Sequence, residues 1–155
     1  MEINIRLAQT IDYEDVSRII DQVQQMHVDW RPDIYKPNDN LLPKDVFEEA
    51  VNNNMYYVAE TEGKTVGVME IMYRHIEAPA LVNRNVIFID TMAVDEIYRG
   101  KGVGHKFFEM VKALKTEKCL DGIELQVNIK NASAITMYEK CGFTIKTINM
   151  ELLDK

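Results

Sequence analysis

The sequence predicts a single α/β (α+β) domain in which helices cover a mixed β-sheet. The chain has 155 residues, enough for one domain with its own core, so residues 1–155 are expected to form one unit. The apolar, β-branched run Val86–Val94 is typical of a buried central strand. The glycine-rich link Arg99–Gly104 follows it, and after this link apolar residues recur with the period of a helix.

The N-terminal third predicts one strand and two helices. Ile3, Ile5 and Leu7 alternate with polar residues, as in a half-buried strand. Thr10 or Asp12 is expected to cap the first helix, because acidic residues follow in its first turn. The predicted elements are a strand over residues 3–7, a helix from the cap to about Val28, an irregular loop from Arg31 to Leu42 and a helix over Pro43–Asn52.

The middle of the chain predicts a β-hairpin ahead of the central strand. Strands over Met55–Glu60 and Thr65–Tyr73 flank a tight turn at Thr61–Lys64. A proline and mixed polarity between Arg74 and Asn85 predict a longer loop.

Beyond the glycines the chain predicts a helix, a strand, a second helix and a last strand. The first helix presents Val103, Phe107, Val111 and Leu114 on one face. Gly142 stands where a glycine commonly ends a helix. The other predicted elements are a strand over Ile123–Asn128 parallel to the central strand, a helix over Asn131–Lys140 and a strand over Thr144–Leu153.

The glycine-rich link has the features of an anion-binding site. The first N–H groups of the following helix lack partners within the helix, and the helix dipole is positive at this end. Glycines let a ligand approach the backbone closely, while Arg99 and Lys101 add positive charge. The spacing fits neither a P-loop nor a dinucleotide fingerprint. A phosphate or pyrophosphate ligand is therefore predicted, and a glycine-rich connector without a ligand is the alternative.

Composition narrows the class of protein. The net charge of −7 argues against general nucleic-acid binding and is compatible with a cationic amine as substrate. No apolar run approaches the roughly 18 residues of a membrane span, and no signal peptide is recognisable, so a cytoplasmic protein without a membrane partner is expected. Cys119 and Cys141 lack metal-ligand spacing, which predicts free thiols and no metal site.

Two segments resemble the signatures of the GNAT family, the Gcn5-related N-acetyltransferases. Arg99, Gly102 and Gly104 form an Arg-x-x-Gly-x-Gly pattern that is similar to the pyrophosphate loop of the family. Further along, an Asn, an Ala three positions on, a Tyr four positions further and then Gly-Phe resemble its second signature. These residues are Asn131, Ala134, Tyr138, Gly142 and Phe143.

The resemblance implies acetyl-CoA as co-substrate and a mostly antiparallel sheet, flanked by about four helices, that splays apart between its two parallel strands. These strands are Val86–Val94 and Ile123–Asn128, and the pantetheine arm is expected to pair with the first of them like an added strand. Asn131 is also open to a simpler interpretation as a helix cap. The residues that the resemblance implies for cofactor binding are Met92, Ala93, Val94, Arg99, Gly100, Lys101, Gly102, Val103, Gly104, His105, Asn131 and Tyr138.

For catalysis, the resemblance implies that Tyr138 protonates the departing thiolate. The candidates for the base are Asp90, which interrupts an apolar strand and is expected on the same face as Met92, and Glu70 in the preceding strand. Each of the two acids could instead be a structural carboxylate, and some family members use ordered water alone.

The expected reaction is direct transfer of an acetyl group to a primary amine of a small molecule or a protein. A non-catalytic CoA-sensing domain and transfer of another acyl group are the alternatives. The loop Trp30–Tyr35 suits a substrate wall or an ordinary packed loop, and His27 and His75 are expected to be solvated or structural. A homodimer is common in the family, and the sequence does not specify the acceptor.

Overall fold

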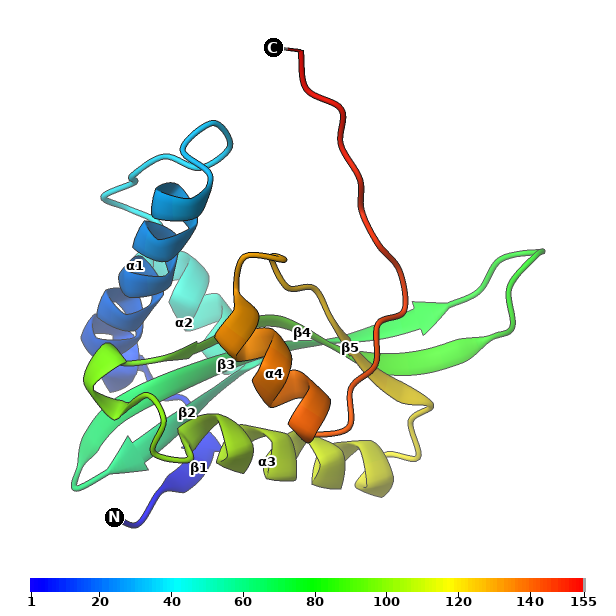
Figure 1. Ribbon diagram of the computed structural model, residues 1–155. Coiled ribbons are helices and arrows are strands. Elements are labelled where there is room, and N and C mark those ends of the chain that lie inside the picture. The colour runs from blue at the N-terminus through cyan, green and yellow to red at the C-terminus, as the bar shows by residue number, and fades with distance from the viewer. Residues whose placement is uncertain (155) are drawn as a thin grey trace.

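The computed structural model describes residues 1–154 and shows a five-stranded sheet with helices on both faces (Figure 1). Neighbouring strands β1 to β4 pair antiparallel, whereas β4 and β5 run parallel, which confirms the predicted mixed sheet. In sheet order the strands are β1 (Asn4–Leu7), β2 (Tyr56–Thr61), β3 (Lys64–Ile76), β4 (Arg84–Val94) and β5 (Gly122–Leu125).

Helices α1 and α2 cover one face of the sheet, and α3 and α4 cover the other, so the core has two layers. On the first face Val16, Ile19 and Phe47 pack on strand residues such as Val58 and Val68. On the second face the apolar stripe of α3 packs against β3 and β4. The helices are α1 (Tyr13–Trp30), α2 (Lys44–Asn52), α3 (Val103–Glu117) and α4 (Ala132–Lys140), with short 3-10 turns η1 (Thr10–Asp12) and η2 (Glu96–Tyr98). Within residues 1–154 none of these helices has the length and apolar character that a membrane span requires.

The predicted loop over Arg74–Asn85 is much shorter than expected. Strand β3 continues to Ile76 and β4 already begins at Arg84, so the two strands form a long hairpin that projects from the body (Figure 1). The Arg74 guanidinium lies 3.6 Å from the centre of the Phe88 ring, and the Nδ1 atom of His75 lies 2.8 Å from the Asn85 side-chain oxygen. Polar residues on this hairpin pair across its two strands, so the polar composition of the segment does not indicate a loop.

The predicted last strand over Thr144–Leu153 is wrong. These residues, called the C-terminal arm below, lie in no strand, and they run from the end of α4 away from the body (Figure 1). The predicted strand over Ile123–Asn128 is also shorter, since β5 ends at Leu125. A strand needs a hydrogen-bonding neighbour, and in the part of the chain that the structure describes β5 pairs with β4 alone.

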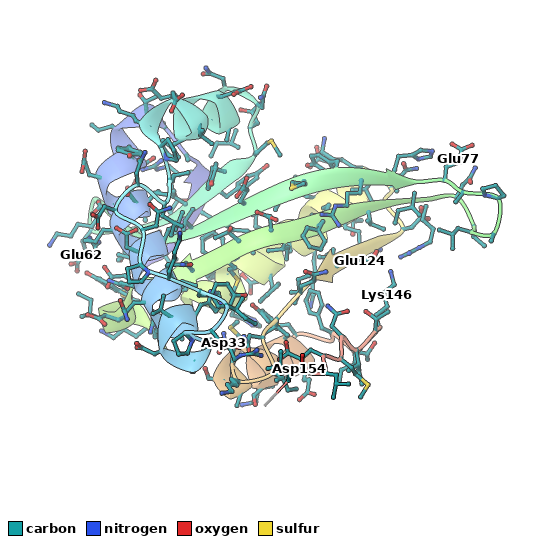
Figure 2. All side chains as sticks on the ribbon, turned by 90° about the horizontal axis from the view of Figure 1, so that it is seen from above. Asp33, Glu62, Glu77, Glu124, Lys146 and Asp154 are labelled. Atoms are coloured by element: carbon teal, nitrogen blue, oxygen red, sulfur yellow. The ribbon has the colours of Figure 1, made fainter. Side chains whose placement is uncertain are left out.

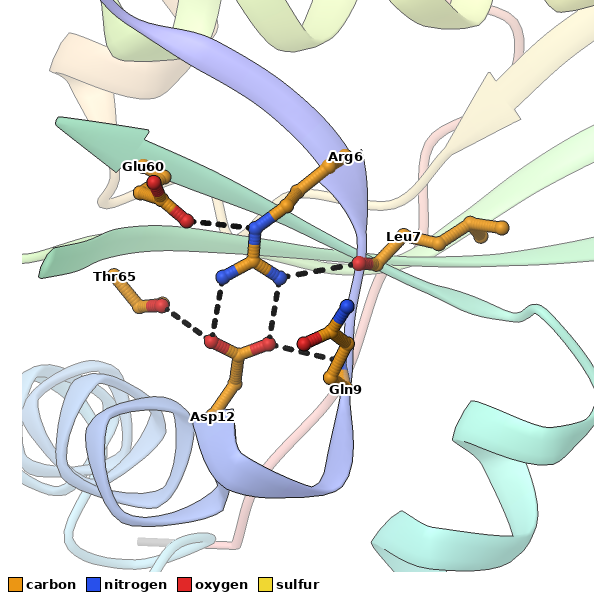
Figure 3. Close-up of polar contacts among 6 residues, drawn as sticks. All are labelled: Arg6, Leu7, Gln9, Asp12, Glu60 and Thr65. Atoms are coloured by element: carbon orange, nitrogen blue, oxygen red, sulfur yellow. Dashed lines mark hydrogen bonds and ion pairs between the residues drawn. The ribbon is translucent and has the colours of Figure 1, made fainter. Parts of the chain in front are cut away.

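Asp12 stands at the N-cap position of α1, one of the two predicted positions, but its side chain does not cap the helix. Asp12 makes no capping bond to α1; its carboxylate instead accepts two hydrogen bonds from Arg6, at 2.8 and 2.9 Å, and one from the Thr65 hydroxyl at 2.8 Å (Figure 3). The backbone N–H of Gln9 donates a fourth, also at 2.8 Å. Arg6 further donates from Nε to Glu60 at 2.7 Å. This network joins β1, β2 and β3 to the start of α1.

Burial opposes ionisation of Asp12, but the bonds from Arg6, Gln9 and Thr65 outweigh it and lower the pKa of this carboxyl group. We therefore expect Asp12→Asn to lower the free energy of unfolding by about 2 kcal/mol at neutral pH, because Arg6 loses its charged partner. A lowered folded-state pKa contributes stability above the unfolded-state value, about 3.9, that is lost as the pH falls through the folded-state pKa.

Urea unfolding of the wild type and Asp12→Asn at several pH values measures this difference, which should shrink below about pH 4. Glu60→Gln is the matched control, because Glu60 is more exposed and should cost less than about 1 kcal/mol. Equal losses in the two variants would contradict a central role for Asp12.

Candidate active site

The two parallel strands separate halfway along β4. Their ladder begins at Val86–Gly122 and ends at Ile89–Leu125. The rest of β4, from Asp90 to Val94, pairs with β3 but has no strand neighbour on its other side within residues 1–154. Backbone groups on this side of β4 are therefore available to an extended ligand that carries amide groups.

The glycine-rich link passes directly from the end of β4 and η2 into α3. Gly100 and Gly102 have positive φ angles of 74° and 90°, and a Cβ atom on either would meet nothing within 4 Å. The backbone of the link is thus held in a conformation that favours glycine and faces open space. The first helical bond runs from Lys106 N to Gly102 O at 3.1 Å, so the N–H groups of Val103, Gly104 and His105 precede the helical ladder of α3.

Close packing holds this helix end against the sheet. A Cβ atom on Gly67 of β3 would lie 2.9 Å from the Val103 side chain and 3.0 Å from that of Phe107, so only glycine permits this approach. A Cβ atom on Gly104 would lie 2.7 Å from the sulfur of Met137 in α4. The start of α3 therefore lies directly between β3 and α4.

An ion pair between a buried carboxylate and an exposed guanidinium ties the link to α1. Asp95 is almost fully buried at the end of β4, and its carboxylate accepts a 2.6 Å hydrogen bond from Arg18 of α1. The same carboxylate accepts from the N–H of Ile97 at 3.3 Å, while Gln22 of α1 accepts from the N–H of Glu96 at 2.9 Å. Helix α1 thus fixes the chain just before the glycines.

The basic residues of the link do not gather over its glycines. Arg99 donates from Nε to the Val94 carbonyl at 3.0 Å and lines a shallow surface cleft against α1. Lys101 lies over the ring of Tyr98, 5.3 Å from its centre. His105 is exposed, and its ring lies 3.6 Å from Glu109. The backbone N–H groups at the start of α3 are therefore the candidate donors for an anion.

Helix α4 brings the second predicted segment to the same region. The Asn131 side chain caps α4 by accepting from the N–H of Ala134 at 3.3 Å. Tyr138 packs edge-on against Phe108 of α3 with ring centres 5.6 Å apart and also contacts Phe143. Burial raises the pKa of Tyr138, which keeps its hydroxyl protonated at neutral pH.

The two acidic candidates meet at an irregularity in the ladder between β3 and β4. Glu70 pairs with Thr91 and Ile71 pairs with Ile89, so Asp90 is the extra residue of a β-bulge. The bulge reverses the alternation of side chains, because Met92 packs with the α3 layer whereas Ala93 packs with the α1 layer. The expectation that Asp90 shares a face with Met92 is therefore wrong.

Glu70 and Asp90 instead lie together on the α1 side of the sheet. Glu70 accepts a 3.0 Å hydrogen bond from the hydroxyl of Tyr56, its partner on β2, whose ring packs against Phe47. Burial raises the pKa of Glu70, the Tyr56 bond lowers it, and the charge and proximity of Asp90 raise it, with a net upward shift. A carboxyl group with a raised pKa accepts a proton more readily than an ordinary carboxylate.

The histidines have structural neighbours. His27 stacks on Tyr35 with ring centres 4.9 Å apart, and burial lowers the pKa of its imidazole. His75 contacts Asn85 and Glu77 near the outer end of the hairpin, where Figure 2 shows Glu77 far from the body. Both residues therefore lie in packing or surface contacts, as the sequence predicts.

The loop after α1 is packed on its neighbours. Arg31 forms ion pairs with Asp33 and with Glu151 of the C-terminal arm, at 2.7 and 2.5 Å. Lys130, in the link between β5 and α4, donates to the Trp30 carbonyl at 3.1 Å. These contacts match the packed-loop alternative for Trp30–Tyr35.

Sequence reasoning missed Tyr56, Gly67 and the pair of Arg18 with Asp95. Gly67 carried a signal, since a glycine inside a strand often marks close approach of another segment. Tyr56 and the ion pair carried none, because their partners lie on other elements.

Comparison with known proteins agrees with this geometry. A family model described as the acetyltransferase (GNAT) family matches residues 21–143. A streptothricin acetyltransferase from Escherichia coli is 37% identical over 62 residues, which are 40% of this chain but only 36% of that enzyme. An L-amino acid N-acetyltransferase from Escherichia coli K12 is 28% identical over 153 residues, covering 94% of this chain and 85% of that enzyme.

Solved structures show the same fold. The crystal structure of a mutant of the BH1408 protein from Bacillus halodurans is similar with a TM-score of 0.88 at 30% identity, covering 98% of this chain and 99% of that one. The parallel strand pair that separates beside a helix beginning at Gly102 belongs to this shared α/β fold. The family match extends over most of the chain, and the protein belongs to the GNAT acetyltransferase family.

The interaction between the two carboxyl groups can be tested by titrating Glu70 with carbon-13 NMR. We expect a pKa for Glu70 above the reference value of about 4.3. Asp90→Asn should lower this pKa by removing a neighbouring negative charge, whereas Tyr56→Phe should raise it by removing a donor to the carboxylate. An unchanged Glu70 titration in Asp90→Asn would show that the two groups do not interact.

Proposed function

We propose that this protein is an acetyl-CoA-dependent N-acetyltransferase that moves an acetyl group by direct attack onto a primary amine of a small molecule or protein. The whole chain, residues 1–155, forms its single catalytic domain. One observation carries this proposal: the unpaired edge of β4 lies next to the free N–H groups at the start of α3. An extended amide ligand that ends in a pyrophosphate needs this combination of groups.

The proposed acetyl-CoA site has two parts, one for the pantetheine arm and one for the pyrophosphate. The stretch Met92, Ala93 and Val94 lies on the part of β4 without a second strand neighbour and would pair with the two amides of the pantetheine arm; Arg99 already donates to the Val94 carbonyl. The N–H groups from Gly100 to His105 surround the open space above the glycines and would bind the pyrophosphate. A backbone N–H near Met92 would also stabilise the oxyanion that forms when the amine attacks the thioester carbonyl.

The acceptor amine must lose a proton to react. An alkyl ammonium group with a pKa of about 10.4 costs roughly 4–5 kcal/mol to deprotonate at pH 7. Glu70 is the stronger candidate for the base, since its raised pKa favours proton uptake, directly or through an ordered water. Asp90 at the bulge lies beside it and adds negative charge that attracts a cationic amine.

The departing thiolate must gain a proton, and Tyr138 is the proposed donor. Reference pKa values of about 10 for a tyrosine and 8.5 for a thiol make donation uphill by at least about 2 kcal/mol, and burial of Tyr138 adds to this cost. The amine nitrogen forms a bond to the acetyl carbon, the carbon–sulfur bond breaks, and CoA leaves as the thiol. Glu70 then releases the proton of the amine to solvent and Tyr138 regains one from solvent.

The acceptor is proposed to be a small amine. The relatives named for streptothricin and for L-amino acids support this class. The carboxylates of Glu70 and Asp90 suit an ammonium group, although a protein amine would meet the same charges.

A thiol-release assay with acetyl-CoA over a panel of amines tests the function. The panel should include amino acids, polyamines, aminoglycosides and peptides with free N-termini. Turnover with at least one amine is expected, together with a thermal shift on adding acetyl-CoA. Binding without turnover across the panel would instead favour a CoA-sensing domain, and turnover with a longer acyl-CoA alone would favour another acyltransferase.

The proposed pyrophosphate loop can be tested by Gly102→Ala. The added methyl group occupies the open space above the link and strains a residue at φ 90° by roughly 1–2 kcal/mol. We expect acetyl-CoA to bind at least about tenfold more weakly in isothermal titration calorimetry.

Gly63→Ala is the matched control, because Gly63 has φ 73° in the turn between β2 and β3. This variant should lose similar stability but keep its affinity for acetyl-CoA. Equal affinity in Gly102→Ala and the wild type would place the pyrophosphate elsewhere.

Tyr138→Phe tests the general acid. We expect kcat to fall by about 10- to 100-fold with little change in the dissociation constant for CoA, since only proton donation is removed. Tyr73→Phe, at an exposed position on the hairpin, is the control and should retain wild-type kcat. Full turnover of Tyr138→Phe with its best amine would exclude this role.

A further inference from the structure

The sheet face that carries Glu70 and Asp90 continues outward along the projecting hairpin of β3 and β4 (Figure 1). Ile71 and Ile89 pack in the α3 layer, so the residues next to them in sequence point to the opposite face. From the bulge outward these residues form one row, which consists of Glu70 and Asp90, then Met72 paired with Phe88, then Arg74. Met72, Phe88 and Arg74 lie outside the apolar cluster that α1 and α2 cover.

The inner end of this row is acidic. Glu70 is half-buried and accepts its 3.0 Å hydrogen bond from the neutral Tyr56 hydroxyl, while Asp90 is exposed. In the part of the chain that the structure describes, neither carboxylate forms an ion pair with a lysine or an arginine. The inner end therefore favours a cationic group, such as the ammonium group of an acceptor.

Arg74 forms the outer end of the row and is held over an aromatic ring. Its guanidinium lies 3.6 Å from the centre of the Phe88 ring, and Phe88 is only 9% exposed. At this distance the guanidinium covers the face of the ring, so the N–H groups at its rim can still bind a planar anion. Arg74 itself is exposed, and the ring beneath it fixes the guanidinium before a ligand arrives.

The carboxylate beside this end of the row is bound by other cations. Glu124 of β5 pairs in register with Phe88, forms an ion pair with Lys146 of the C-terminal arm, toward which it points in Figure 2, and lies 3.5 Å from Arg84. The hydrogen bond from Lys146 lowers the pKa of Glu124 against the effect of its burial. The charges of Arg84 and Arg74 lower this pKa further. Three cations thus act on one carboxylate, and the outer end of the row remains positive.

We propose that Arg74 determines the specificity of the acceptor site: it binds the carboxylate of an α-amino acid whose ammonium group lies at Glu70 and Asp90. This inference rests on the proposed acetyl transfer and specifies the class of its acceptor. Phe88 and Asp90 are two residues apart, which is about 7 Å along a strand. The ammonium and carboxylate groups of one amino acid span this spacing with a charge-assisted hydrogen bond at each end.

Other amines match the row less well. A polyamine or an aminoglycoside that reached along the row would place a second cation against Arg74, and like charges at close range disfavour binding. The N-terminus of a peptide has an amide where an amino acid has its carboxylate, so Arg74 would gain no charged partner. The opposite charges at the two ends of the row therefore favour a zwitterionic acceptor.

Amino acids and their amides form matched pairs of ligands, because the amide keeps the amine and loses the carboxylate. Isothermal titration calorimetry with each standard amino acid and its amide, in the presence of CoA, measures binding without requiring turnover. The wild type should bind its preferred amino acid about 10- to 100-fold more tightly than the corresponding amide, as expected for one hydrogen-bonded charge pair.

Arg74→Gln should remove this preference by weakening binding of the amino acid while affinity for the amide stays unchanged. Arg74→Lys keeps the charge but loses the planar fork of donors, so it should restore only part of the preference. Lys118→Gln is the matched control: Lys118 lies 5.4 Å from the ring centre of Tyr73, whose partner Ile87 packs in the α3 layer on the other face of the hairpin. This control should keep the wild-type preference.

The thiol-release assay separates this inference from the proposed function. Turnover of amines without preference for a carboxylate would overturn the role of Arg74 and leave the acetyl transfer standing. Carboxylate-dependent binding that Arg74→Gln abolishes, without turnover of any amine, would contradict the acetyl transfer and support Arg74 as a carboxylate site. A wild type that binds none of the amino acids, or a preference that survives in Arg74→Gln, would overturn the inference.

Discussion

The parallel ladder between β4 and β5 ends after Ile89 and Leu125, and the rest of the candidate site depends on this separation. If the two strands stayed paired to their ends, the backbone of Met92 and Val94 would be satisfied within the sheet and unavailable to a ligand. The helices on either side of the gap then supply what a strand edge alone lacks. Helix α3 begins next to this part of β4 with N–H groups that lack helical partners, and α4 packs on α3 through Tyr138 and Phe108.

The β-bulge at Asp90 places apolar residues and acidic residues on different faces of the sheet. Before the bulge Ile87 and Ile89 belong to the α3 layer, and after it Met92 belongs to the same layer. The extra residue keeps both halves of the strand packed on α3 while it turns Asp90 toward Glu70. The apolar layer is therefore continuous, and the acidic groups lie together on the opposite face, where α1 and α2 cover the sheet.

The N-terminal part of helix α1 is bound both to β1 and to the end of β4. Its start is fixed by Asp12 and Arg6, and its middle by Arg18 and Asp95, so movement of α1 would disturb the glycine link. The loop that follows α1 is bound in turn to Lys130 and to the C-terminal arm through Arg31.

The sequence by itself determined the class of fold, the order of its elements and the glycine link at a helix start. These follow from local rules, because hydrophobic period, glycine and capping residues act over a few neighbouring positions. For the same reason the sequence also predicts Asn131 as a helix cap, and its side chain does cap α4.

Only the tertiary structure decided the features that depend on distant partners. The bulge reversed the expected face of Asp90, and it brought Glu70, Asp90 and Tyr56 together from three strands. The same dependence explains the C-terminal arm: its alternating pattern favours a strand, but a strand exists only where another strand offers hydrogen bonds. The sequence determines the hydrophobic period of each segment, whereas strand pairing depends on the neighbouring strand.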